Sequence, residues 1–305
     1  MSELIKGMVF FSCFLPSFTR IGYNARKTLW RKERWDFSDQ NWIVTGATSG
    51  IGLEIAQQAA RAGAQVHVIS RNAQKLAEVE AKAGTAMVTH TADLSNMNEV
   101  QQIAQQLPKV DVLVNNVGLM LNERHLTQQG HEQSFATNVL GHYLLTETLD
   151  ALKRLEHGTV INMSSGGMYN VPMTLERLQG GDTFDGMLTY AYQKRAQVLL
   201  NSWWRAKGLN SYVMHPGWVD TPGVETAMPD FYRLTRGVLR SPSAGADTAL
   251  WLAAHQPEQL HDTAIWFDRS QRNAHYFSDT RKGASDAELI SYLDQCLAGA
   301  MPLVA

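Results

Sequence analysis

A tyrosine and a lysine in this chain have the spacing needed for proton transfer. Tyr190 and Lys194 lie four positions apart, so on a helix they share one face. A free tyrosine has a pKa of about 10, and a nearby cation favours its phenolate. Tyr190 could then exchange a proton with a substrate oxygen. A Tyr-x-x-x-Lys pair is more often a simple surface pair, and Tyr192 is a local alternative without a lysine four residues later.

A serine pair upstream could complete this arrangement. Ser164 and Ser165 follow an apolar run from residue 158 to Met163 that reads as a strand. A hydroxyl at a strand end can donate to a substrate oxygen and orient it, and we assign this role to Ser165. A serine, a tyrosine and a lysine together suit proton transfer coupled to hydride movement.

A glycine-rich stretch near the start of the chain could hold the cofactor that carries this hydride. An apolar run, Trp42-Ile43-Val44, passes through a glycine turn into a helical pattern. Glycines let the backbone approach phosphates, and a helix N-terminus offers free N–H groups. The T-G-x-x-x-G-I-G spacing is not the commonest fingerprint, and such a turn can be a mere chain reversal. The candidate cofactor contacts are Gly46, Thr48, Ser49, Gly50, Ile51 and Gly52.

Strands and helices alternate along the rest of the chain. Alternation of this kind predicts βαβ units, a parallel sheet and ligands beyond the carboxyl ends of the strands. We expect an α/β fold, a single Rossmann-type doubly wound domain over 41–305, with a seven-stranded parallel sheet. The expected strands are 42–44, 65–69, 86–90, 110–114, 158–163, 209–214 and 264–267. The expected helices are 51–63, 73–83, 95–106, 127–149, 190–207, 243–254 and 285–297.

The end of the second expected strand indicates which dinucleotide is bound. Enzymes that prefer NAD usually carry an acidic residue here for the ribose hydroxyls. This chain has Ser70 and Arg71 instead. An arginine can make a charge-assisted contact with a 2′-phosphate, so we expect NADP(H) to be favoured over NAD(H). The alternative is an arginine that only faces solvent.

Two further strand ends carry polar groups or glycine. Asp93, followed by Leu94, could bond the adenine edge or could simply cap the next turn. Asn116 and Gly118 suit a close approach to the cofactor, or else form an ordinary Asn-Gly-type turn. We include all four residues among the candidate cofactor contacts.

Composition excludes several classes of function. The chain has 305 residues, a net charge of −2 and 18% charged residues, which fits a globular protein and gives no basic field for nucleic acid. Its two cysteines, Cys13 and Cys296, form neither a metal motif nor a disulfide framework. We expect a cytoplasmic protein without a metal site.

The first 40 residues read as an arm that precedes the domain. The apolar run from Met8 to Leu15 is too short to span a bilayer, which takes roughly 20 residues. Basic residues follow it between Arg20 and Arg34. Such an arm could lie on an anionic membrane surface, or it could pack against its own domain or a partner subunit.

These motifs together resemble the short-chain dehydrogenase/reductase family. The resemblance covers about Asn41 to Asp268, and the segments Met163–Met168, His215–Val224 and Trp266–Arg269 are most similar to one subgroup. The motifs occur in the family's order: Thr45-Gly46-x-x-x-Gly50-Ile51-Gly52, Asn115-Asn116-Val117-Gly118, Asn138, Ser165, Tyr190-x-x-x-Lys194 and Pro216-Gly217-Trp218-Val219-Asp220-Thr221.

The resemblance implies an NAD(P)-dependent oxidoreductase acting on a carbonyl or alcohol. Asn138 would hold a water that continues a proton relay from Lys194. Ser165 would polarise the substrate oxygen, and Tyr190 would be the acid/base. Lys194 would bind the nicotinamide ribose and lower the pKa of Tyr190. The cofactor would also contact Pro216, Gly217, Val219 and Thr221. Family relatives often form dimers or tetramers through the long helices, so we also expect a homo-oligomer.

The sequence departs from the family pattern beside the substrate. Val117 stands where alanine is common, and the Ser165–Tyr190 interval is long at 25 positions (190 − 165). A lid at about 222–242 carries apolar and aromatic residues, which favours a lipophilic small-molecule substrate, although core packing would explain them equally. Asp268, Arg269 and His275 could close the pocket floor or form a structural ion pair. The alternative function is a non-catalytic NADP-binding sensor or scaffold.

Overall fold

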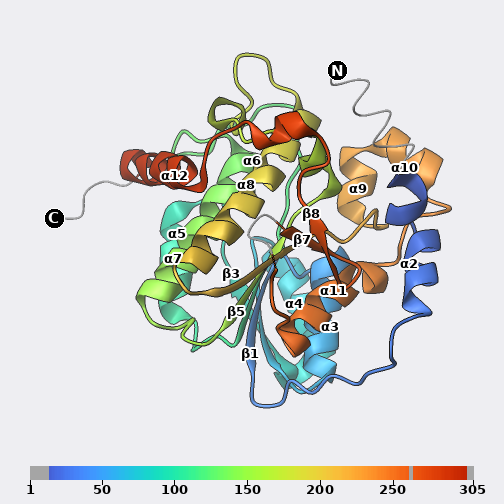
Figure 1. Ribbon diagram of the computed structural model, residues 1–305. Helices are drawn as coiled ribbons and strands as arrows, with labels where there is room; N and C mark the ends of the chain where they lie inside the picture. Colours follow the sequence, from blue (N-terminus) through green and yellow to red (C-terminus); the bar gives the residue numbers. More distant parts are fainter. Residues whose placement is uncertain (1–13, 261–263, 301–305) are drawn as a thin grey trace.

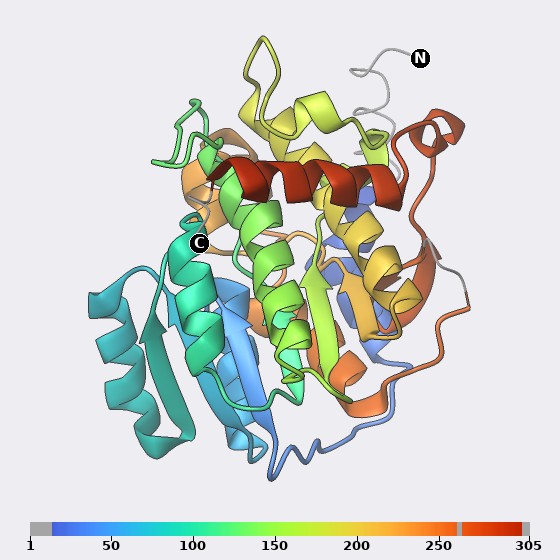
Figure 2. The same cartoon turned by 90° about the vertical axis from the view of Figure 1, so that its left-hand side faces the viewer.

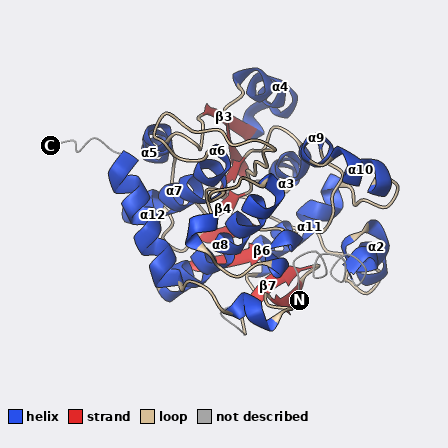
Figure 3. Cartoon of the chain, turned by 90° about the horizontal axis from the view of Figure 1, so that it is seen from above, coloured by secondary structure: helices blue, strands red, loops and turns tan. Residues whose placement is uncertain are grey.

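The computed structural model shows a parallel sheet between two layers of helices (Figures 1 and 3). It describes residues 14–260 and 264–300. Within these residues the sheet has eight strands in the order β3-β2-β1-β4-β5-β6-β7-β8. β1 to β7 are parallel and match the seven expected strands, while β8 pairs antiparallel with β7. The α/β doubly wound fold is therefore confirmed, and the strand number is corrected from seven to eight.

The strands bury both faces, as a sheet covered on two sides requires. In β1, Ile43 enters the core on one face while Trp42 and Val44 enter the core on the other. The strands are β1 (Asn41–Thr45), β2 (Gln65–Ser70), β3 (Met87–Thr91), β4 (Val112–Asn115), β5 (Thr159–Met163), β6 (Asn210–Met214), β7 (Ala264–Phe267) and β8 (Ser270–Asn273).

One face of the sheet carries α3 (Gly50–Arg61), α4 (Ala73–Ala83) and α11 (Pro242–His255) (Figure 3). The other carries α5 (Met97–Gln106), α7 (Gly141–Ala151) and α8 (Gly186–Ala206). The last helix, α12 (Asp286–Ala300), crosses the outside of α7 and α8 (Figure 2). Leu289 and Leu293 of α12 are buried there, and the Tyr143 hydroxyl donates to Asp294 at 2.8 Å.

The long helix expected over 127–149 is interrupted, and that prediction was wrong at its start. Residues Thr127–His131 form a turn, with Gly130 at a φ of 81°. Glu132 then caps the short helix α6 (Gln133–Phe135) by accepting from two backbone N–H groups. A π-helical turn, η2 (Ala136–Leu140), separates α6 from α7 and contains Asn138. Such bulges often occur at functional sites.

The described part of the N-terminal arm packs against its own domain through several side chains. Phe18 is buried against His215 and Phe267, and α2 (Arg20–Lys27) follows it beside the lid (Figure 1). Arg26 reaches Asp268 with a 2.6 Å hydrogen bond. Most of the apolar run from Met8 to Leu15, together with Cys13, lies outside the described residues.

The lid expected at 222–242 contains two short helices, α9 (Pro222–Ala227) and α10 (Pro229–Thr235). Short 3-10 turns lie at η1 (Gly84–Ala86), η3 (Gly166–Asn170), η4 (Leu175–Arg177) and η5 (Ser278–Arg281). In the part of the chain that the structure describes, no helix is long and apolar enough to cross a membrane.

Candidate active site

Tyr190, Lys194 and Ser165 meet at the carboxyl ends of β4 and β5. Ser165 lies two residues after the end of β5, directly before η3, and hydrogen-bonds the Tyr190 hydroxyl. The Lys194 ammonium lies 5.4 Å from the centre of the Tyr190 ring. A Cβ added to Gly118 would lie 3.5 Å from Lys194 Nζ and 3.8 Å from Tyr190 Oη. The exposed backbone of Gly118 therefore faces the Lys194 ammonium and the Tyr190 hydroxyl with no side chain in between.

Burial sets the proton affinities of this pair. It raises the pKa of Tyr190 to about 12, and the Ser165 hydrogen bond opposes that rise. It also lowers the pKa of Lys194 to about 7. Lys194 Nζ donates to the Met163 carbonyl at 2.7 Å, and no described carboxylate forms an ion pair with it. The tyrosine is accordingly a phenol near neutral pH, which is the form that donates a proton.

Asn138 is fully buried below these groups. Its side-chain Nδ2 donates to the Leu119 carbonyl and to Gln193 Oε1, both at 2.7 Å. Its Oδ1 accepts from the Leu119 backbone N–H at 2.8 Å. The amide thus holds the loop that follows Gly118, and the π-helical turn leaves the Asn138 carbonyl available on the Lys194 side.

Gln197 and His142 join this site although the sequence patterns did not identify them. Gln197 Oε1 lies 3.3 Å from Lys194 Nζ, and Gln197 Nε2 donates to the Asn138 carbonyl at 2.9 Å. His142 Nδ1 lies 3.2 Å from the same carbonyl. The spacing of Tyr190, Lys194 and Gln197 along one helix face is the signal that could have revealed Gln197.

The glycine turn has the shape of a phosphate cradle. Gly46 and Gly50 have φ values of 67° and 56°, which favour glycine. A Cβ on Gly52 would lie 2.3 Å from Asn116 Nδ2, so only glycine fits at this position. Thr48 and Ser49 are partly exposed at the start of α3, and Ser49 makes no side-chain cap. The first N–H groups of α3 are therefore open to an anion.

The loop after β6 lies against this turn. A Cβ on Gly50 would lie 3.1 Å from Thr221 Cγ2, and a Cβ on Gly245 would contact both Val219 and Ile51. Gly217 takes a φ of 78°. The Pro216 carbonyl accepts from Arg240 at 3.1 Å.

Arg71 and Asp93 face each other at the carboxyl ends of β2 and β3. Arg71 lies 3.9 Å from Asp93 Oδ2, and Ser70 Oγ accepts from the Asn72 N–H at 3.4 Å. Asp93 Oδ1 accepts from the N–H and hydroxyl of Ser95, so it does cap the following turn. The Leu94 side chain is buried in the core, which leaves only its backbone for a ligand.

The other residues considered for the pocket floor are structural. Asp268 binds Arg240 and Arg26, while Arg269 forms two hydrogen bonds with Asp247 at 2.7 and 2.8 Å. His275 Nδ1 lies 2.9 Å from Thr280 Oγ1.

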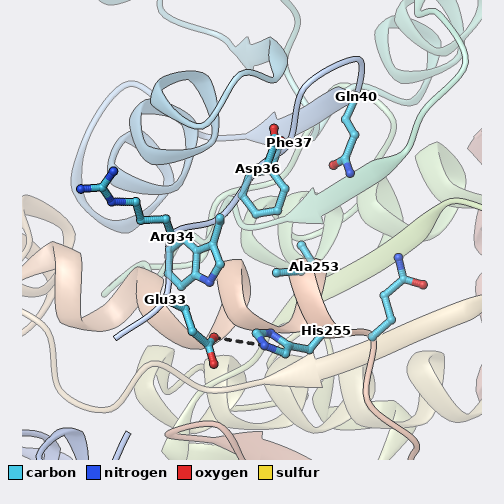
Figure 4. A pocket seen from close by; sticks show the side chains of 10 residues that line it. Glu33, Arg34, Asp36, Phe37, Gln40, Ala253 and His255 are labelled. Carbon is cyan, nitrogen blue, oxygen red and sulfur yellow. Dashed lines mark ion pairs between the residues drawn. The ribbon is translucent and has the colours of Figure 1, made fainter. Parts of the chain in front are cut away.

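Two cavities lie away from Tyr190. One, of about 330 Å³, adjoins Gln40 before β1 and His255 at the end of α11, which places it at the amino ends of the strands (Figure 4). His255 is 3.1 Å from Glu33 there. The other, of about 190 Å³, lies in an aromatic cluster that includes Phe14 and Tyr276.

Comparison with known proteins identifies the family. A family model described as short chain dehydrogenase matches residues 40–175. The chain is 35% identical to dehydrogenase/reductase SDR family member 12 of Homo sapiens, covering 96% of this chain and 98% of that protein. The chain belongs to the short-chain dehydrogenase/reductase family. It is an oxidoreductase of this family, which binds NAD(P), and the glycine turn and Gly118 fit such a dinucleotide.

One further relative and one solved structure extend the comparison. Retinol dehydrogenase 11 of Mus musculus is 30% identical over 227 residues, covering 69% of this chain and 72% of that protein. The Pseudomonas aeruginosa RhlG/NADP active-site complex has a TM-score of 0.58 at 22% identity, covering 73% of this chain and 93% of that chain. At that identity the structure supports the fold alone.

Proposed function

We propose that this protein is an NADP-dependent oxidoreductase that interconverts a lipophilic carbonyl compound and its alcohol, with Tyr190 as acid and base. The observation that carries the proposal is the convergence of Tyr190, Lys194 and Ser165 on the open backbone of Gly118. A substrate oxygen placed there could accept hydrogen bonds from two hydroxyls.

A dinucleotide held by the glycine turn and Gly118 would supply hydride to the carbonyl carbon, or take it back in the reverse direction. In reduction, the carbon–oxygen π bond breaks as Tyr190 transfers its hydroxyl proton to the substrate oxygen. The raised pKa of Tyr190 keeps that proton in place until the oxygen becomes basic. Ser165 donates to the same oxygen and orients it.

Lys194 acts on Tyr190 through its charge. An ammonium beside the Tyr190 ring stabilises the phenolate that remains after proton transfer. Lys194 would also donate to the nicotinamide ribose. We assign Asn138 to the same site, because its carbonyl is linked to Lys194 through Gln197.

The preference for NADP rests on Arg71. Its side chain is 54% exposed, and its ion pair with Asp93 is long at 3.9 Å and therefore weak. The guanidinium can turn toward a 2′-phosphate with little loss of free energy. Ser70 offers a hydroxyl beside it. We propose that the dinucleotide also contacts the glycine turn, Gly118 and the loop from Pro216 to Thr221.

The lid supports a lipophilic substrate. Phe231 of α10 packs edge-on to Trp218 at 5.2 Å, and Leu234 of α10 is 82% exposed. The segment begins at Thr221, which lies against Gly50 of the glycine turn, and apolar side chains there favour hydrocarbon over a charged ligand.

Peripheral membrane contact and self-association remain predictions. Ile21 and Leu29 are 59% and 84% exposed on the arm, close to basic residues. Deleting the arm would also remove Phe18 and Arg26 from the domain, so vesicle co-sedimentation of Ile21→Glu and Leu29→Glu variants is the cleaner test of contact. A partner subunit that approached α7 and α8 would contact α12 first, because α12 lies across their outer side (Figure 2).

The test of the proposed reaction is oxidation of NADPH with a panel of lipophilic aldehydes and ketones, and the reverse reaction with the alcohols. We expect turnover with at least one pair. Tight NADPH binding without turnover across the panel would contradict the proposal and favour a sensor or scaffold.

A further inference from the structure

A buried amide joins Lys194 to the interior of the protein at the point where the family resemblance places a water. Gln197 Oε1 faces the ammonium and Gln197 Nε2 faces the Asn138 carbonyl. This orientation satisfies both partners, because an ammonium only donates and a carbonyl only accepts. Gln197 is 1% exposed, so no bulk solvent competes for these bonds.

The bridge continues beyond Asn138. His142 Nδ1 contacts the same carbonyl, and His142 Nε2 lies 3.4 Å from Thr45 Oγ1. Thr45 Oγ1 accepts from the N–H groups of Asn116 and Val117 at 3.0 Å each. A chain of side-chain and backbone groups therefore runs from the end of β1, next to the glycine turn, to Lys194.

We propose that Gln197 is a positioning residue for the reaction, which fixes the Lys194 ammonium beside Tyr190 by bridging it to the Asn138 carbonyl. The effect on turnover rests on the proposed function, whereas the hydrogen bonds of Gln197 to Lys194 and Asn138 do not depend on it. Lys194 has two side-chain or backbone acceptors, Met163 and Gln197, and no described carboxylate as an ion partner. The titratable groups that face it are Tyr190 on its own helix and His142 on α7.

Losing one of its two hydrogen-bond acceptors should destabilise the charged form of Lys194. Hydrogen bonds to charged groups are strong enough that we expect the Lys194 pKa to fall by about one unit in Gln197→Leu. Less positive charge beside Tyr190 then disfavours its phenolate. The pH midpoint of alcohol oxidation should rise, with a rate about tenfold lower at a fixed pH below the midpoint.

The experiment is an NMR titration of the full chain with ¹³C-labelled lysine, with the Lys194 signal assigned by its loss in Lys194→Met. We expect the Lys194 midpoint to fall in Gln197→Leu and to rise in Gln197→Glu, since a carboxylate favours the ammonium. Gln193→Leu is the matched control, because Gln193 is a buried glutamine of the same helix that bonds Asn138 but not Lys194.

Unchanged Lys194 midpoints in both Gln197 variants, or an equal shift in Gln193→Leu, would overturn the proposal. If Gln197→Leu does not fold, the direction of the shift in Gln197→Glu decides. The titration needs no substrate, so a protein without turnover would contradict the proposed function while the bridge is still tested. The pH profile of turnover supplies the second readout.

Discussion

Replacing Asp268 with asparagine should lower the free energy of unfolding by about 3–5 kcal/mol, the typical loss when one partner of a buried ion pair is removed. Asp268 is 2% exposed and accepts from two arginines. Arg240 donates to its two oxygens at 2.6 and 3.0 Å, and Arg26 donates at 2.6 Å. Asparagine keeps the shape and tolerates the positive φ of 50° at this turn, so the variant removes mainly charge.

The loss should also loosen the active site, because Arg240 is shared. It donates to the carbonyls of Ser17, Phe18 and Pro216 at 2.7 to 3.1 Å. These bonds hold the arm against the loop that follows β6. The Asp268 turn therefore ties the arm to a segment that we propose contacts the cofactor.

The assay is urea denaturation of the full chain followed by tryptophan fluorescence. Asp230→Asn is the matched control, since Asp230 pairs with Arg233 on the exposed surface of α10 and should leave the midpoint unchanged. A fall of less than about 1 kcal/mol in the free energy of unfolding of Asp268→Asn would refute the reasoning, because Arg240 would then be buried without a carboxylate partner and should destabilise the fold by more than that.

Three further predictions concern the cofactor site and the interior. Arg71→Ala should weaken NADPH binding at least about tenfold and leave NADH binding unchanged, measured by fluorescence titration; an equal effect on both would remove the NADP preference. Gly118→Ala should weaken dinucleotide binding by about tenfold without changing the urea midpoint, whereas Gly237→Ala, with open space around it, should change neither. Burial lowers the pKa of His142 to about 3. Between pH 6.5 and pH 3, His142 is therefore protonated in the unfolded chain but neutral in the folded one. Stability should fall by about 1.4 kcal/mol per pH unit in that window for this group, and His142→Gln should show a shallower slope in acid denaturation; an unchanged slope would contradict the burial argument.

The spacing of apolar residues was enough to predict the main helices and strands, because each element buries apolar side chains at regular intervals. Trp42-Ile43-Val44 read correctly as a strand, since both faces of the sheet are covered. The Tyr190–Lys194 spacing placed both side chains on one helix face, and the structure brings them together with Ser165.

Features that depend on tertiary pairing were missed. β8 has a polar sequence, and it forms only because the two-residue turn at Asp268 and Arg269 folds it back onto β7. Asp268 suits such a turn, but Arg269 stands where a glycine usually signals it. The segment from Thr127 has a helical pattern, yet Gly130 and the Glu132 cap delay the helix to Gln133.

Gln197 illustrates a different limit. Its helix position was predictable, but a glutamine on a helix face does not reveal its partner. Its contact with Lys194 joins residues three apart on α8, but its second bond is to the carbonyl that the π-helical turn at Asn138 presents. No local pattern encodes a bond between segments 59 residues apart.

The most direct measurement is turnover by Tyr190→Phe, with NADPH binding measured on the same preparation. Tyr192→Phe is the matched control, because Tyr192 is a tyrosine of the same helix that lies in the hydrophobic core. We predict that Tyr190→Phe binds NADPH like the wild type but loses turnover by at least about a hundredfold, while Tyr192→Phe retains it. Substantial turnover by Tyr190→Phe would contradict the central claim that this hydroxyl exchanges the proton with the substrate.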